Sequence, residues 1–265
     1  MPTYRDEAVV LRTHRLGEAD RIITLLTREH GKIRAVAKGV RRTKSRFGAR
    51  LEPFFHVDIQ CHIGRALDTV TEVSVLHAYG SVLAAHWPAW SAGSAMLETA
   101  DKLTSEDREP QTAQFRLLVA ALNSLSKAEH DSGLILDAYF IRACSLAGYA
   151  PALTACVVCD GDVDAAFFHV QSGGVMCSGC KAPGSTAVST SVVELMSALL
   201  AGQWDVADAS AQADRRVASA LIGAHVQHNL ERGLRSLPHV DRAEAQHPSS
   251  VDEPDADSPI QQESA

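Results

Sequence analysis

The first 80 residues show the alternation of apolar and polar positions that is typical of β-strands. The clearest case is residues 54–63, where polar side chains alternate with five apolar ones: Phe55, Val57, Ile59, Cys61 and Ile63. Successive side chains of a strand point to opposite faces, so this strand has one buried face, which carries Cys61. His62 then points to the other face, which excludes a catalytic pair between these two neighbours.

Four further strands are expected in the same region. Residues 32–38 place Lys32, Arg34 and Lys38 on one face and small apolar side chains on the other. The remaining three strands cover 9–13, 22–27 and 67–76. Five short strands with a polar strand face and a basic loop favour a small barrel, and we predict an OB-fold over residues 1–80.

From about residue 81 the apolar positions recur at helical spacing. Residues 132–148 are apolar on nearly every side, which predicts a helix buried at the centre of its domain, with Cys144 inside it. A last helical stretch is expected over 211–235. These segments predict a mainly helical domain over residues 81–240.

Local signals predict where two of these helices begin and end. Pro110 suits the first turn of a helix. Ser191 and Glu194 have capping-box spacing ahead of an apolar helix, which Gly202 is expected to terminate.

The composition bounds the class of protein. A chain of 265 residues with 46% apolar content is long enough for two domains with sizeable cores. It has no apolar run near the roughly 18 residues that span a bilayer, and its start lacks the features of a signal peptide. We therefore expect a cytoplasmic protein without a membrane partner. Beyond residue 240 acids, serines and prolines prevail, so residues 241–265 are expected to be a disordered acidic tail.

Positive charge is concentrated in one segment. Residues 28–50 hold nine lysines and arginines and one acid, a net charge of +8 in a chain whose net charge is −7. Such a segment attracts anions locally, and the phosphates of nucleic acid are its natural target. The expected DNA-binding residues are its cations from Lys32 onward and the aromatic residue of its loop: Lys32, Arg34, Lys38, Arg41, Arg42, Lys44, Arg46, Arg50 and Phe47.

Two features of this segment have a second interpretation. Phe47 can stack on a base whatever the sequence of the strand, but its ring can equally pin the loop to the barrel. A cationic segment is also often no more than a solvated surface. The near absence of acids from residues 28–50 favours the functional interpretation.

Four of the six cysteines form two Cys-x-x-Cys pairs separated by seventeen residues: Cys156 with Cys159, and Cys177 with Cys180. Two such pairs at this spacing indicate four thiolates around one zinc ion. Residues 165–176 between them show a strand, turn and strand pattern, and a hairpin brings the pairs together. Four thiolates leave the ion no open position, so we predict one structural Zn²⁺ in a module at residues 151–183.

Other chemistries fit the cysteines less well. A dithiol redox motif needs a single pair, and an iron–sulfur cluster usually shows different spacing. A zinc deaminase needs His-x-Glu, which the chain lacks, and a proline where Ala155 stands. His169 lies between the pairs, but four cysteines suffice. The chain also lacks a phosphate-binding loop, GxGxxG, HExxH and GxSxG, so we expect neither a nucleotide site nor an enzyme.

Several stretches together follow the pattern of a known family. Residues 16–32 are LGEADRIITLLTREHGK and residues 37–53 are AKGVRRTKSRFGARLEP. LAGYAP at 146–151 leads into the first cysteine pair, and GGVMC at 173–177 opens the second. These stretches resemble the zinc-bearing branch of the RecO family of bacterial recombination mediators and DNA-repair proteins. The resemblance covers about residues 1–237 and leaves out the acidic tail.

The resemblance implies an α+β protein with an N-terminal OB-fold, a helical second domain and a structural zinc module. It also implies a non-enzymatic role in the nucleoid. Members of the family bind single- and double-stranded DNA, anneal complementary strands and engage RecR and single-strand-binding protein. They help to load RecA onto coated strands, and they do not hydrolyse nucleotides.

Two other functional classes remain compatible with the residues. A nuclease-like enzyme needs a metal-binding cluster of acids, and the barrel has only scattered ones such as Asp20 and Asp58. A zinc-ribbon adaptor that binds only protein would leave the basic segment incidental. Magnesium-dependent strand cleavage identifies the first, and DNA binding with and without the loop charges identifies the second.

Overall fold

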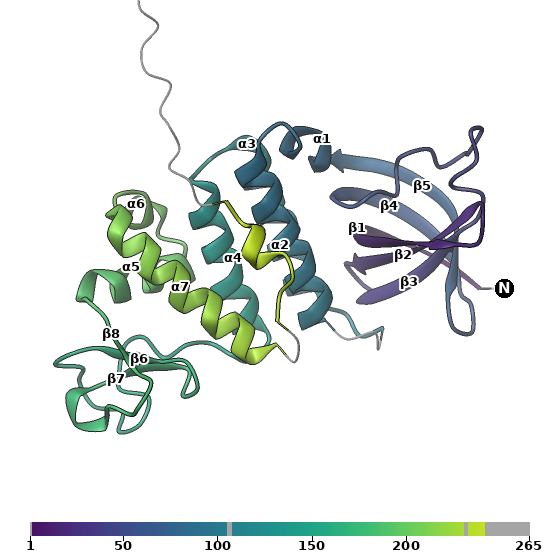
Figure 1. Cartoon of the computed structure of the whole chain (residues 1–265). Helices are drawn as coiled ribbons and strands as arrows, with labels where there is room; N and C mark the ends of the chain where they lie inside the picture. The colour runs from purple at the N-terminus through teal and green to yellow at the C-terminus, as the bar shows by residue number, and fades with distance from the viewer. Residues whose placement is uncertain (1, 105–107, 231–232, 242–265) are drawn as a thin grey trace, which may run out of the picture.

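The computed structural model describes residues 2–104, 108–230 and 233–241. It confirms the α+β architecture, with a barrel at one end, helices in the middle and a small sheet at the other end (Figure 1). No helix of the described residues is long and apolar enough to cross a membrane. Beyond Asp241, the expected acidic tail lies outside the described residues.

The N-terminal strands close into a five-stranded barrel in the order β1-β2-β3-β5-β4, in which only β3 and β5 pair in parallel. This is the barrel predicted from the strand pattern. Four predicted strands are confirmed within two residues at each end, whereas the strand expected at 9–13 runs over 14 residues. The bounds are β1 Thr3–Leu16, β2 Asp20–Thr27, β3 Lys32–Ala37, β4 Phe55–His62 and β5 Asp68–Ala78.

Strand β1 contributes to two hydrophobic cores. Ala8 and Val10 point into the barrel, whereas Val9 and Leu11 belong to the core of the helices. Both faces of the strand are therefore buried, which fits its continuous apolar run. Cys61 lies in the barrel core, as its place in the alternating pattern predicted.

Seven helices are assigned within the described residues, and α4 lies at their centre. Helix α4 is buried on most sides, as predicted, and Cys144 is fully buried in it. Leu146 at its end is 50% exposed, because the helix has by then left the core. The bounds are α1 Tyr79–Leu83, α2 Trp87–Leu103, α3 Thr112–Lys127, α4 Ser132–Leu146, α5 Thr190–Ala201, α6 Trp204–Asp208 and α7 Gln212–Asn229.

The helix starts correct two predictions. Helix α3 takes Gln111 as its N-cap, so Pro110 precedes the helix instead of lying in its first turn. Helix α5 takes Ser189 as its N-cap, since the Ser189 hydroxyl accepts a hydrogen bond from the backbone N–H of Val192. The capping box expected at Ser191 is therefore wrong by two residues. Gly202 ends the same helix in the left-handed conformation, as predicted.

The small sheet at the other end carries the cysteines. Strands β6 (Phe167–His169) and β7 (Gly174–Met176) form the predicted antiparallel hairpin. A third strand, β8 (Thr186–Ala187), pairs with β6 and was not expected from the sequence. Phe168 and Val175 of this sheet belong to the hydrophobic core of the helices, so the module is packed onto them.

Candidate nucleic-acid interface and metal centre

The basic segment between β3 and β4 is held on the barrel by apolar anchors. Val40, Phe47 and Leu51 are buried in the barrel core. Its beginning is also fixed by hydrogen bonds: the Asp20 carboxylate accepts from the backbone N–H of Gly39 at 2.7 Å, and the carbonyl of Ala19 accepts from that of Arg41 at 3.0 Å. Gly39 has a φ of 67°, which suits glycine at this turn.

The path of this segment follows from the strand register. Strand β3 ends beside the beginning of β5, where Val36 pairs with Thr69, whereas β4 begins beside the end of β5, where Phe55 pairs with Ala78. Residues 38–54 therefore run along most of β5, about 30 Å at 3.3 Å per residue. Figure 1 shows this segment along the upper side of the barrel.

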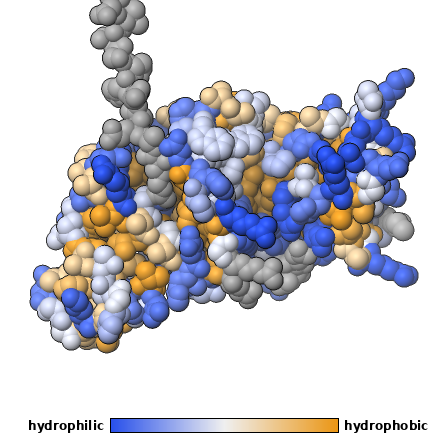
Figure 2. Space-filling view, in the orientation of Figure 1, coloured by the Kyte–Doolittle hydropathy of each residue, from blue (hydrophilic) through white to orange (hydrophobic). Residues whose placement is uncertain are grey.

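Six cations project from this path, before and between the buried anchors. We call them the basic track, and all six are exposed: Lys38, Arg41, Arg42, Lys44, Arg46 and Arg50. Strongly hydrophilic side chains stand out from the barrel in this part of the surface (Figure 2). Two of these side chains contact the rest of the barrel. The Arg41 Nη1 donates to the carbonyl of Glu18 at 2.8 Å, and the Arg46 guanidinium lies 4.7 Å from the ring centroid of Phe47.

Two of the expected DNA-binding residues are placed elsewhere. Phe47 is 1% exposed, so its ring anchors the segment and cannot stack on a base in this conformation. Lys32 is 7% exposed, and its Nζ donates to the backbone carbonyl of Asp101 in α2. Both predictions are corrected, because Phe47 is part of the barrel core and the Lys32 ammonium is bound by the carbonyl and carboxylate of Asp101. Arg34 lies half-buried in β3 and is not one of the six exposed cations.

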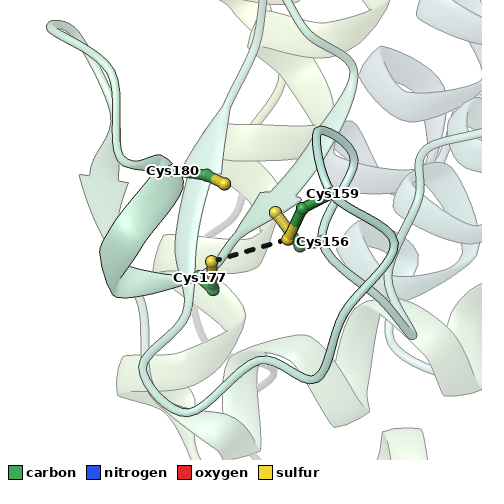
Figure 3. Close-up of side chains that lie close together, drawn as sticks. All are labelled: Cys156, Cys159, Cys177 and Cys180. Atoms are coloured by element: carbon green, nitrogen blue, oxygen red, sulfur yellow. Dashed lines mark hydrogen bonds between the residues drawn. The ribbon is translucent and has the colours of Figure 1, made fainter.

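The four cysteines converge on one point, as predicted. Cys156 and Cys159 lie on a turn, whereas Cys177 is the N-cap and Cys180 the last residue of the short 3-10 helix Ser178–Cys180 (Figure 3). All four Sγ atoms lie within 4.8 Å of one another, and those of Cys159 and Cys177 are 3.9 Å apart. The edge of a tetrahedron with metal–sulfur bonds of about 2.3 Å is about 3.8 Å long. The residues therefore fit one tetrahedral metal ion.

Backbone hydrogen bonds position this quartet. The N–H of Cys156 donates to the carbonyl of Gly161 at 3.0 Å, and the N–H of Val157 donates to Val175 at 2.9 Å, which ties the first turn to β7. Backbone N–H groups of Cys159, Cys177 and Val158 lower the pKa of Cys156 to about 6. A thiolate is the form that binds a metal, so the fold prepares this ligand.

Cys180 becomes a thiolate more readily beside the positive charge of an ion. Hydrogen bonding with Cys159 and Cys177 and burial raise the pKa of Cys180 to about 12. Four thiolates repel one another at these distances, and a bound cation removes that cost. His169 takes no part, because its Nδ1 lies 2.8 Å from the Ser172 hydroxyl and it is outside the quartet.

Two of the three anchors of the basic segment, Val40 and Leu51, were missed at the level of sequence, whereas anchoring by Phe47 was one of its two interpretations. Val40 and Leu51 lie among the cations at an irregular spacing, so no periodic pattern marks them. Asp20 was considered only as a scattered acid, and it fixes the beginning of the segment. The usable signal was the pair of apolar residues interrupting a run of cations, since an isolated apolar side chain in a charged loop often serves as an anchor.

Comparisons with known proteins match both parts of the chain. The family model described as Recombination protein O N terminal matches residues 1–79, and that described as Recombination protein O C terminal matches residues 85–238. DNA repair protein RecO of Thermobifida fusca (strain YX) is 54% identical over 243 residues, which cover 92% of this chain and 100% of that protein. DNA repair protein RecO of Nocardioides sp. (strain ATCC BAA-499 / JS614) is 50% identical over 243 residues, which cover 90% and 99%. The chain therefore belongs to the RecO family.

Proposed function

We propose that this protein is a non-enzymatic DNA-binding recombination mediator that acts in DNA repair. It binds single- and double-stranded DNA along the basic track and anneals complementary strands without nucleotide. With RecR, it helps to load RecA onto strands coated by single-strand-binding protein. The observation that carries the proposal is the set of six exposed cations held along the barrel by buried anchors.

Electrostatics support this role for the track. The chain as a whole has a net charge of −7, so nonspecific attraction to phosphate elsewhere on the surface is weak. A row of cations spaced along about 30 Å matches a backbone better than a compact anion. Annealing brings two repelling backbones together, and a basic face lowers that repulsion.

The metal that we assign to the cysteine quartet is one structural Zn²⁺. Four thiolates at tetrahedral spacing suit zinc, and they leave no coordination position for a substrate. The ion would hold the module, whose Phe168 and Val175 pack into the helical core. We further propose three units, namely an OB-fold over residues 1–80, a helical domain over 81–240 and the zinc module at 151–183 within it.

Strand annealing is the decisive experiment. The purified full-length protein is mixed with complementary strands, one carrying a donor dye and the other an acceptor, and energy transfer is followed with and without ATP. We expect faster annealing than in buffer alone, and the same rate in both conditions. Repeating it on strands coated with single-strand-binding protein tests the mediator role.

Two results would overturn this function. Magnesium-dependent cleavage of either strand would indicate a nuclease-like enzyme. Absence of any DNA binding, together with retained binding to RecR, would indicate an adaptor that acts through protein contacts alone.

A further inference from the structure

A second feature of the described residues has the chemistry of a ligand site. A cavity of about 360 Å³ lies where the barrel meets helix α3. We call it the junction cavity, and its lining includes Glu7, Arg28, His56, His77, Tyr79 and Arg116. Pockets for small ligands begin at about 300 Å³, so this volume suits a group no larger than one nucleotide.

Flat rings form one wall of the junction cavity. The ring centroids of His56 and His77 are 5.7 Å apart with planes at 21°, and those of His77 and Tyr79 are 5.5 Å apart with planes at 12°. Phe115 meets His56 edge-on at 5.7 Å. His77 is exposed, so this row of nearly parallel rings is open to solvent at one member. Bases stack on such surfaces whatever their identity.

The imidazole of His56, the buried ring of this wall, has unpaired hydrogen-bonding groups. His56 is 6% exposed, and neither of its ring nitrogens has a hydrogen-bond partner among the described residues. The Glu7 Oε2 lies 3.8 Å from Nε2, which is beyond hydrogen-bond length. A neutral imidazole offers one donor and one acceptor, the combination that the edge of a base can satisfy.

The charges around the cavity leave one cation available. Arg28 lies 3.7 Å from the Glu7 carboxylate and 3.1 Å from that of Glu29. Arg116 is exposed on α3 and forms no hydrogen bond or ion pair with any residue that the structure describes. A phosphate attached to a base in the cavity can therefore pair with Arg116.

The segment that carries the basic track leads into a strand that lines this cavity. The segment carrying the track runs toward the helices and continues into β4, whose second residue is His56. A strand that follows the cations from Lys38 to Arg50 arrives at the junction between barrel and helices. This continuity favours a nucleic-acid strand over an acidic peptide as the occupant.

We propose that the junction cavity takes up one nucleotide of a single DNA strand, with its base against the exposed His77 ring and its phosphate on Arg116. This inference rests on the DNA binding proposed above and adds to it a contact that depends on the base. Binding along the track alone depends only on phosphates. The two contacts are therefore separable by experiment.

Two probes of equal charge test the cavity in the full-length protein. One is a single strand of thymidines, and the other is a strand of the same length with abasic sites in its central half. Fluorescence anisotropy is expected to show binding of the abasic strand weaker by at least about fivefold, since each stacked base contributes about 1 kcal/mol or more. His77→Ala should remove this difference by lowering affinity for the thymidine strand only. Arg116→Gln should weaken both.

Controls separate recognition from folding. Lys127→Gln removes an exposed cation from the same helix, outside the cavity, and should leave both affinities unchanged. Thermal melts verify that each variant is folded. A strand with one 2-aminopurine reports stacking directly, and its fluorescence change on binding the parent protein should be absent with His77→Ala.

Any of four results would overturn the inference. The first is equal binding of both strands by the parent protein, and the second is a His77→Ala variant that keeps the full difference and the full fluorescence change. The third is an acidic peptide that binds the parent but not Arg116→Gln, while Arg116→Gln binds DNA like the parent. The occupant of the cavity would then be a protein partner. If replacing Arg41, Arg42 and Lys44 together by alanine abolishes DNA binding while both cavity variants bind like the parent, the proposed function stands and this inference fails. If the parent binds neither strand, the proposed function fails as well.

Discussion

The Lys32 Nζ lies 3.4 Å from the Asp101 Oδ1, so a lysine of the basic segment joins strand β3 to helix α2. Asp101 also receives a hydrogen bond of 2.6 Å from the Arg12 Nε of β1. Two cations of the barrel thus share one carboxylate of the helical part. Lys32 therefore stabilises the contact between barrel and helices, and its positive charge is paired with Asp101 and not with a phosphate.

Replacing Lys32 tests this assignment. Lys32→Ala should lower the free energy of unfolding by about 1–3 kcal/mol, because it leaves the backbone carbonyl of Asp101 without its side-chain donor and the carboxylate with Arg12 as its remaining cation. DNA affinity of the folded variant should stay close to that of the parent. Lys38→Ala removes an exposed cation of the same segment, and its stability should stay within about 0.5 kcal/mol of the parent. Urea unfolding and anisotropy measure the two quantities. If Lys32→Ala had the stability of the parent but bound DNA weakly, Lys32 would belong to the DNA-binding surface.

The strand alternation predicted the direction of these side chains but not what covers them. The pattern placed Lys32 on the outer face of the barrel, which is correct, yet that face is covered there by α2. The partner of Lys32 is 69 residues away in the chain, and no local pattern encodes such a distance. His56 shows the same effect, because it occupies a polar position of its strand and is buried under α3.

The cysteine module was predictable for the opposite reason. Two Cys-x-x-Cys pairs with a hairpin between them are a local arrangement, and ligand geometry allows few ways to close it. Only two residues separate the cysteines of each pair, so both thiols of a pair can point to the same ion. The loop residue Phe47 had no such constraint, so the sequence left its direction open between base and barrel.

Removing a ligand of the metal should loosen the second domain. Apparent binding energies of structural zinc sites are about 10–16 kcal/mol, similar to the stability of a whole domain. Cys156→Ser and Cys177→Ser should therefore lower the melting temperature and expose Phe168 to solvent. Val158→Ala changes an exposed residue, 61% accessible, between two of the cysteines and should melt like the parent.

Metal analysis and calorimetry measure these effects. We expect one zinc per chain in protein purified without chelator, and less than one in either cysteine variant. Protein without metal would refute the site. A variant that loses zinc but melts like the parent would show that the ion does not stabilise the fold.

The salt dependence of DNA binding should identify the basic track. If about five phosphates of a single strand are neutralised, the slope of log affinity against log salt is near −3.5, at about 0.7 per phosphate. Replacing Arg41, Arg42 and Lys44 together by alanine should flatten the slope by about 2 and weaken binding. The fold should persist, because these side chains are exposed and the anchors remain.

A charge-matched control distinguishes the track from net charge. A variant lacking Arg5, Lys127 and Arg235 loses the same three charges from exposed positions elsewhere. Its slope should equal that of the parent. Equal effects of the two triple variants would mean that the protein attracts DNA through its overall charge, and an unchanged slope in the first would place the interface on another surface.

Acid should weaken the fold partly through His56. Burial lowers the pKa of His56, and the nearby His77 adds to this effect while Glu7 of β1 opposes it. Arg28 and Arg116 also line the cavity beside the ring. In the unfolded chain a histidine titrates near pH 6.5, so the unfolded state binds the proton first as pH falls. The stability that depends on neutral His56 is present above about pH 6.5 and is lost as pH falls toward the lower folded pKa.

The variant His56→Gln cannot take up this proton. Its melting temperature should therefore fall less between pH 7 and pH 5 than that of the parent, whatever its stability at pH 7. His239→Gln, at an exposed position, should keep the dependence of the parent. Burial lowers the pKa of His225 as well, so part of the effect should remain in His56→Gln and decrease further when both are replaced. An equally steep acid dependence in the double variant would assign the effect to carboxylates, since it would then continue below the range of either histidine.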